Sequence, residues 1–269
     1  MDKKVKNFNT RLRTIQIWEL ALAAILSFIA TEVLAVIFPA IDMNDDLFMI
    51  ALLVFILLFF IWCLKDTEGL SKDIGEVKLK ENRNEILYVF ILNIIFAYLF
   101  LFSVATLDMI FGMDDPTWVS IMDIDSVNLT PGALIFSTIA SIIFAPILEE
   151  LIFRGVLFNR LKIRIGIIPA MIISSFLFSI GHDFGGIVSA FLFGLCMCIL
   201  YLKTDNILIP ITVHFMNNIA AALIDITPFD SIVTTFPWII LLGIIVLAGT
   251  VLLIKYIISE TKTLKQKFS

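Results

Sequence analysis

Charged residues are scarce in this chain. Only 16% of its 269 residues are Asp, Glu, Lys or Arg, whereas 60% are hydrophobic, and the mean hydropathy is +1.02. A soluble globular domain carries about 25% charged and about 45–50% apolar residues. The excess of apolar residues excludes most soluble proteins as well as disordered chains. Much of the surface must therefore face lipid.

Glycine, proline and cysteine are also few, with twelve, eight and three residues. These numbers exclude a collagen-like chain and a disulfide-rich scaffold. Cys63, Cys196 and Cys198 all fall in apolar stretches, and we interpret them as thiols that fill the core. A net charge of −5 argues against nucleic acid as a partner.

Long apolar stretches recur along the whole chain. Crossing a hydrocarbon core of about 30 Å takes roughly 20 apolar residues in a helix. Eight stretches qualify: residues 15–41, 48–64, 86–106, 132–159, 167–181, 187–202, 207–224 and 237–257. The predicted fold is an all-α, polytopic membrane helix bundle with about eight transmembrane helices. Glycines at 181, 185 and 186 predict that the fifth and sixth stretches form a hairpin that turns inside the membrane.

Lysine and arginine are missing from every second loop. All 19 lie on the side of the amino terminus or in or at the end of a stretch. The opposite loops carry acids instead: Asp42, Asp45 and Asp46 in the first, and Asp108, Asp114, Asp115, Asp123 and Asp125 in the second. Because basic residues stay on the cytoplasmic side, this pattern predicts that both termini are cytoplasmic.

Few ionisable residues remain inside the stretches. Burying a charge at the membrane centre costs about 2.5–3.5 kcal/mol even on a lenient scale, so such residues mark candidate functional sites. The fourth stretch contains Glu149, Glu150 and Arg154, the fifth ends with His182, and the seventh contains His214 and Asn218. The two histidines are the only ones in the chain.

The spacing of these residues separates the two carboxylates. Glu150 and Arg154 are four residues apart, in the order that favours an ion pair on one helix. Glu149 points about 100° away and has no base at a matching position, so it is a candidate general acid or base. His214 and Asn218 share one helix face. Taken alone, the pair of Glu150 and Arg154 is equally consistent with a structural clamp, but the six residues together favour a functional site.

The order of these motifs resembles a known family. Glu-Glu-x-x-x-Arg at residues 149–154 is followed by Phe-x-x-x-His at Phe178 and His182, and by His-x-x-x-Asn at His214 and Asn218. This combination resembles the CAAX protease and bacteriocin-processing family, also called the Abi family, over about residues 130–225. The resemblance implies an intramembrane endopeptidase that acts on a membrane-associated protein or peptide.

The resemblance also implies a role for each residue. Glu149 with His182 would activate the attacking water, His214 and Asn218 would stabilise the oxyanion, and Glu150 with Arg154 would hold the shape and charge of the site. Members have been described both as metalloproteases and as metal-independent glutamate proteases. Glu149, His182 and His214 are a possible set of Zn²⁺ ligands, although the chain has no His-Glu-x-x-His motif. A mechanism without an obligatory metal is slightly favoured.

Three segments follow from these observations. Residues 1–130 would hold the first three helices and an amphipathic cytoplasmic loop at 65–85, interpreted mainly as a solvated or lipid-surface face. Residues 131–225 would hold the catalytic helices, and residues 226–269 the eighth helix and a basic tail. The resemblance and the compact chain suggest a bacterial plasma membrane and a role in peptide maturation or bacteriocin self-immunity.

Two other functions use the same residues. The first is a proton- or ion-coupled transporter, in which the Glu, His and Arg side chains form a relay. Transporters often contain inverted repeats with broken helices at matching positions, but the one interrupted hairpin has no counterpart in the first half of the chain. The second is a catalytically idle relative that acts as an immunity or scaffold protein, against which the intact set of six residues argues.

Overall fold

The structure is a bundle of helices. The computed structural model describes residues 5–111, 135–136, 138–182, 186–225, 232 and 235–268. Within these ranges it has no β-strand beyond one isolated bridge between Asn7 and Glu68. The all-α prediction is therefore confirmed for the described part of the chain. The second acidic loop, with Asp114, Asp115, Asp123 and Asp125, lies outside the described residues, as do residues 183–185 of the predicted hairpin.

Four of the described helices are long and apolar enough to cross a membrane. They are α2 (Ile17–Ile37), α4 (Asp45–Leu64), α12 (Ile187–Thr204) and α15 (Trp238–Phe268). Their length and composition identify an integral membrane protein. The count of eight crossings and the cytoplasmic position of the termini stay predictions.

The other predicted stretches are helical too. They correspond to α6 (Lys80–Phe111), a composite rod, α11 (Ile167–Ser179) and α13 (Leu208–Asp225). The rod consists of η1 (Ala140–Phe144), α9 (Ala145–Glu150), η2 (Leu151–Phe158) and α10 (Asn159–Ile165). The short helix α1 (Phe8–Leu12) precedes α2, and two others, α3 (Pro39–Asp42) and α5 (Leu70–Val77), lie between longer helices. α15 continues through the predicted basic tail, so most of that tail is helical.

Side chains cap the amino-terminal ends of α2 and α4. The carboxylate of Glu19 accepts a hydrogen bond of 2.8 Å from the backbone of Gln16 and closes the start of α2. Asn44 accepts a hydrogen bond of 3.0 Å from the backbone of Leu47 at the start of α4. Both side chains satisfy backbone groups that a helix terminus leaves unpaired. Glu19 thus has a structural role at the start of α2.

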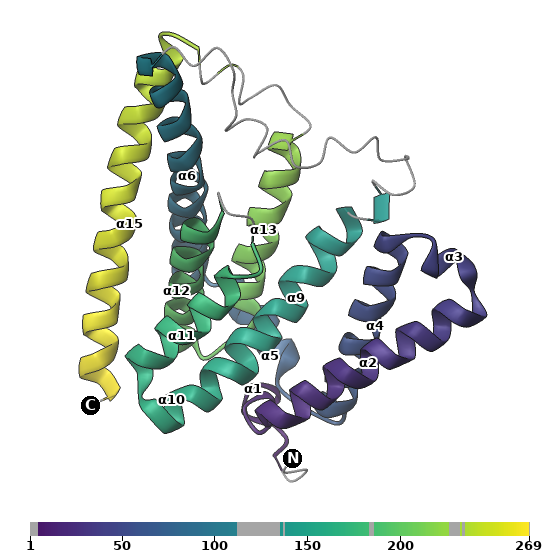
Figure 1. Cartoon of the computed structure of the whole chain (residues 1–269). Helices are drawn as coiled ribbons and strands as arrows, with labels where there is room; N and C mark the ends of the chain where they lie inside the picture. Colours follow the sequence, from purple (N-terminus) through teal and green to yellow (C-terminus); the bar gives the residue numbers. More distant parts are fainter. Residues whose placement is uncertain are drawn as a thin grey trace.

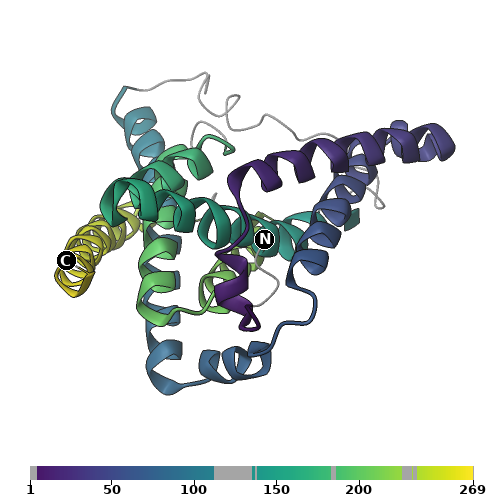
Figure 2. The same cartoon turned by 90° about the horizontal axis from the view of Figure 1, so that it is seen from below.

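The rod crosses between two groups of helices. α15 and α6 stand side by side at one flank, and α2 and α4 form a hairpin at the other, with the rod between them (Figures 1 and 2). α11 packs on α12, and α13 contacts both α6 and α9. The two ends of the chain lie at the same end of the bundle (Figure 1).

Helix α12 forms the centre of the core. Every residue from Cys196 to Leu202 is buried, because other helices surround this part of α12. A Cβ atom added to Gly194 would lie 2.8 Å from Cβ of Ser175, so the absence of a side chain lets α11 approach closely. All three cysteines are buried and free, which agrees with their interpretation as core residues.

The hairpin of α2 and α4 leaves most of its apolar surface uncovered. Of the apolar window of α2, 22% is buried, and of that of α4 only 11%. Large side chains such as Trp18 and Val36 are 64% and 82% exposed. A soluble protein rarely exposes continuous apolar surface of this extent, so these faces are suited to lipid.

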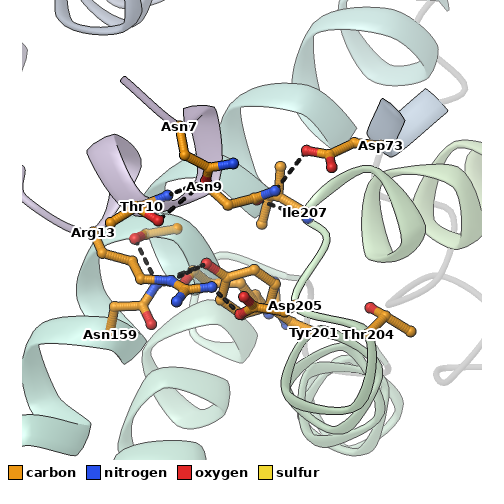
Figure 3. Close-up of polar contacts among 12 residues, drawn as sticks. Asn7, Asn9, Thr10, Arg13, Asp73, Asn159, Tyr201, Thr204, Asp205 and Ile207 are labelled. Atoms are coloured by element: carbon orange, nitrogen blue, oxygen red, sulfur yellow. Dashed lines mark hydrogen bonds and ion pairs between the residues drawn. The ribbon is translucent and has the colours of Figure 1, made fainter. Parts of the chain in front are cut away.

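Polar contacts tie the amino-terminal segment to the loop after α12. Asn9 donates a hydrogen bond of 2.6 Å to Asp73 of α5 and accepts one of 3.2 Å from the backbone of Ile207 (Figure 3). Asp73 is consequently buried. Asp73 is the exception within residues 65–85, since the other residues of this loop are exposed or half-buried, as a solvated or lipid-surface face requires.

Candidate active site

The composite rod carries the two adjacent carboxylates. Glu149 and Glu150 are the last residues of α9, with the π-helical segments η1 and η2 on either side. The wider turns of a π-helix shift the direction of the side chains that follow, and such segments are frequent at functional sites. The sequence predicted one regular helix here, because periodicity over an apolar stretch does not distinguish α from π turns.

Glu150 is the anchor of the site. Its side chain is fully buried, and one oxygen, Oε1, accepts a hydrogen bond of 2.9 Å from Nη1 of Arg154. Arg154 is also fully buried, and its guanidinium lies 4.5 Å from the centre of the Phe178 ring. The predicted pairing of Glu150 with Arg154 is present, and each charge offsets the burial cost of the other.

His214 joins this anchor to Glu149. Its Nδ1 atom lies 2.9 Å from Oε1 of Glu150, and its Nε2 atom lies 3.6 Å from Oε2 of Glu149. The imidazole is buried, with 3% of the residue exposed. An Nδ1–H group that donates to Glu150 sets the orientation of the ring, so Nε2 is directed toward Glu149.

The two carboxylates have opposite surroundings. The Glu149 side chain is 33% exposed, whereas that of Glu150 is completely enclosed. Glu149 is therefore half-buried and accessible, while Glu150 is occupied by Arg154 and His214. The buried Oε2 atom of Glu150 and the Nε and Nη2 atoms of Arg154 have no hydrogen-bond partner among the described residues. These open polar atoms are suited to ordered water.

His182 lies in the turn that follows α11 and is exposed. Its Nδ1 atom is 3.2 Å from the carbonyl oxygen of Phe178, and the two rings are 4.7 Å apart. The Phe178 ring also makes an edge contact with His214 at 5.8 Å. Phe178 thus holds both histidines. The described contacts include no ion pair between His182 and Glu149. These two site residues are therefore not paired directly.

Asn218 connects α13 to the rod. Its Nδ2 atom donates a hydrogen bond of 2.7 Å to the carbonyl oxygen of Ser141 in η1. It lies one helical turn beyond His214, as the spacing predicted, but the contact with Ser141 was not foreseen. An amide nitrogen has two hydrogens, so one donor remains available.

Two residues that contact the site could not be identified from the sequence. Phe193 of α12 packs against His214 with ring centres 5.0 Å apart. Asn159 donates hydrogen bonds to the carbonyl oxygens of Arg154 and Gly155, at 3.0 and 2.8 Å, where η2 gives way to α10. A phenylalanine in an apolar run is indistinguishable from core. Asn159 is the last residue of the predicted stretch 132–159 and is followed by basic residues, so the sequence suggests a position at the membrane surface. In the structure its side chain is fully buried.

The possible zinc ligands are not gathered into one coordination sphere. Within the described ranges, no group of three His, Cys, Asp or Glu side chains is placed to hold a metal ion. The Nδ1 atoms of His182 and His214 face Phe178 and Glu150, and Nε2 of His214 faces Glu149. As arranged, Glu149, His182 and His214 do not fit the compact geometry of a tetrahedral zinc site.

Comparison with known proteins agrees with the motif pattern. Residues 131–220, which include all six site residues, match the family model described as "Type II CAAX prenyl endopeptidase Rce1-like". A Bacillus subtilis (strain 168) protein named "Putative membrane peptidase YdiL" is 32% identical over 106 residues, which are 39% of this chain and 42% of that protein. The match thus spans less than half of the relative's length. No solved structure matches the chain.

These findings confirm the resemblance to the CAAX protease and bacteriocin-processing family. They cover the segment that carries Glu149, Glu150, Arg154, His182, His214 and Asn218. That segment is similar to the CAAX endopeptidase family model, and it is set in a helical integral membrane protein.

Proposed function

We propose that this protein is an intramembrane endopeptidase that hydrolyses a peptide bond of a membrane-associated protein or peptide. The observation that carries the proposal is the contrast between Glu149 and Glu150. Glu149 is half-buried and accessible, whereas Glu150 is enclosed and bound to Arg154 and His214. Two neighbouring carboxylates with different surroundings can take different roles, one chemical and one structural.

In the proposed reaction, Glu149 is the general base. It takes a proton from a water molecule, whose oxygen attacks the carbonyl carbon of the scissile bond. The bond between that carbon and the amide nitrogen then breaks, and Glu149 returns the proton to the departing amine. The exposed His182 helps to position the water through Nε2, because its Nδ1 is occupied by the Phe178 carbonyl.

His214 and Asn218 stabilise the oxyanion in this proposal. The Nδ1 atom of His214 faces Glu150, and an Nε2–H group directed toward the site would donate to the oxyanion. Asn218 contributes the amide hydrogen that Ser141 does not use. Glu150 and Arg154 keep His214 in place. The proposed mechanism uses no metal ion, which is supported by the absence of a group of three possible metal ligands among the described residues.

The setting of the reaction follows from the charge pattern. We propose that the end of the bundle with both termini is cytoplasmic and that the membrane is a bacterial plasma membrane. Peptide maturation and bacteriocin self-immunity are the proposed processes.

The test is cleavage by purified protein in detergent. Membrane-associated peptides are incubated with the wild type, with Glu149→Gln and with Glu32→Gln, and products are identified by mass spectrometry. Glu32 is an exposed carboxylate of α2 outside the site, so its variant is a matched control. We expect cleavage by the wild type and Glu32→Gln and none by Glu149→Gln. Equal cleavage by all three would overturn the role of Glu149.

Two further arms separate the alternatives. A chelator that abolishes cleavage, with recovery on adding Zn²⁺, would contradict the mechanism without a metal. Proton or solute flux into proteoliposomes that Glu149→Gln abolishes, in the absence of any cleavage, would favour the transporter and overturn the peptidase.

A further inference from the structure

A cavity of about 380 Å³ lies at the end of the bundle that carries both termini. It is lined by residues from four separate parts of the chain: Arg13 before α2, Lys162 on α10, Lys203 near the end of α12 and Lys267 near the end of α15. Four basic side chains thus meet around one cavity. Its volume is within the range of small-molecule sites.

Acids neutralise part of this charge. Arg13 forms an ion pair with Asp205, which also lines the cavity. The ammonium of Lys203 lies 2.5 Å from Glu85 and 3.0 Å from Glu260, so this cation is balanced. Arg13 and Lys203 are therefore held in fixed positions by carboxylates.

Lys162 has no such partner among the described residues. Its ammonium lies 5.5 Å from the centre of the Phe158 ring. The charge of Arg13 repels it, and that of Asp205 attracts it. Burial, followed by the charge of Arg13, lowers the pKa of Lys162 to about 8. A cation in this position gains free energy when an anion enters the cavity.

Hydrogen bonds organise the wall of the cavity. The phenol oxygen of Tyr201 is 3.3 Å from Nε of Arg13 and 3.0 Å from the amide nitrogen of Asn159 (Figure 3). Asn159 in turn binds the backbone of the rod at Arg154. Arg13 is thus held on two sides, by Tyr201 and Asp205, and loses little freedom when it binds a ligand.

The position of the cavity indicates the source of an anion. It lies where the apolar helices α12 and α15 end and where α2 is about to begin. Ile167 and Leu202 add apolar surface to the basic wall. Basic pockets between membrane helices are typical sites for anionic lipid headgroups. A guanidinium and an ammonium together suit a phosphate group.

We propose that this cavity binds the phosphate group of an anionic membrane lipid, with Lys162 and Arg13 as the charged contacts and Ile167 and Leu202 beside the glycerol and upper acyl chain. A free phosphate ion also carries negative charge, but it has no acyl chain to contact Ile167 and Leu202. The proposed lipid site lies at the end of the rod away from Glu149, so it stands independently of the proposed peptidase activity.

The test is lipid binding to the full chain in detergent, measured by native mass spectrometry with phosphatidylglycerol, phosphatidylcholine or inorganic phosphate. We expect tighter binding of phosphatidylglycerol than of the two other probes. Lys162→Gln should weaken it about fivefold, the effect of one basic residue at an anionic surface. Lys162→Arg should preserve it. Arg164→Gln, which removes an exposed base of α10 outside the cavity, is the matched control and should preserve binding as well.

Two results would overturn the proposal. One is equal affinity for phosphatidylglycerol and phosphatidylcholine, which would show that net charge is not recognised. The other is the same effect of Lys162→Gln and Arg164→Gln, which would assign the binding to the general surface charge. Inorganic phosphate that binds as tightly as phosphatidylglycerol would overturn the lipid as the source of the anion.

Discussion

His214 and Arg154 share one oxygen atom of Glu150. The Nδ1 atom of His214 and the Nη1 atom of Arg154 each lie 2.9 Å from Oε1. One buried carboxylate therefore orients a histidine from α13 and balances a cation on its own rod. Because Glu150 is used in this way, only Glu149 of the two acids has an accessible side chain, and substitutions can distinguish the roles of the two residues.

The first prediction concerns the stability of the two acid variants. Glu150→Gln leaves the Arg154 charge buried without compensation, and we expect it to lower the free energy of unfolding by about 3–5 kcal/mol. Glu149→Gln changes a partly exposed side chain and should cost less than about 1 kcal/mol. Thermal unfolding in one detergent measures both. Equal destabilisation would contradict the assignment of Glu150 as the structural partner.

The second prediction concerns His214. His214→Phe keeps an aromatic ring against Phe178 and Phe193 but removes both nitrogens. We expect the rate of peptide cleavage to fall about 10²–10³-fold, the usual loss when one hydrogen-bond donor to the oxyanion is removed. Turnover at saturating peptide measures this loss. A change in KM with unchanged kcat would place His214 in substrate binding instead.

The third prediction concerns Asn159. Asn159→Leu removes the donors that satisfy the carbonyl oxygens of Arg154 and Gly155, and each buried group left unpaired costs about 1–3 kcal/mol. Tyr201→Phe removes a single hydroxyl at the same place and should cost less, about 0.5–1.5 kcal/mol. Unfolding curves of the two variants show which substitution lowers the free energy of unfolding more. The reverse order would show that the rod does not depend on the Asn159 amide.

The fourth prediction concerns the contact between η2 and α1. A Cβ atom added to Gly155 would lie 2.6 Å from Cδ2 of Leu12, whose side chain is fully buried. Gly155→Ala should therefore destabilise the protein by about 1–3 kcal/mol. Leu12→Ala removes the clash, so the double variant should lose less than the sum of the two single variants. Additive losses would contradict a direct contact.

The fifth prediction concerns Lys162 and pH. Its pKa in the folded protein is lowered to about 8, below the ordinary value of a lysine. Between pH 8 and about 10.4 the unfolded chain holds a proton that the folded chain has released, so the contribution of Lys162 to stability rises with pH in this window. Lys162→Met should therefore raise Tm at pH 7, and this gain should shrink by pH 10. A constant difference across the pH range would contradict the lowered pKa.

The sequence predicted the helical membrane class because hydropathy depends only on composition and on the length of apolar runs. The six candidate site residues were also predictable, since charge is rare in such runs and the spacing of Glu150 and Arg154 suits a helix. By contrast, η1 and η2 were not predictable, because their hydrogen-bond pattern depends on neighbouring helices. Asn218 illustrates the difference, since its position followed from spacing but its bond to Ser141 did not.

The sequence by itself determined that the chain is helical, that it belongs in a membrane and which ionisable residues remain among its apolar helices. Only the tertiary structure decided that Glu150 is enclosed and Glu149 open, that Phe178 holds both histidines, and that Lys162 and Arg13 meet at one cavity. The physical reason is the distance along the sequence over which each effect acts. Hydropathy and helical spacing act between residues close in sequence, whereas burial and charge pairing join residues that only the packing of separate helices brings together.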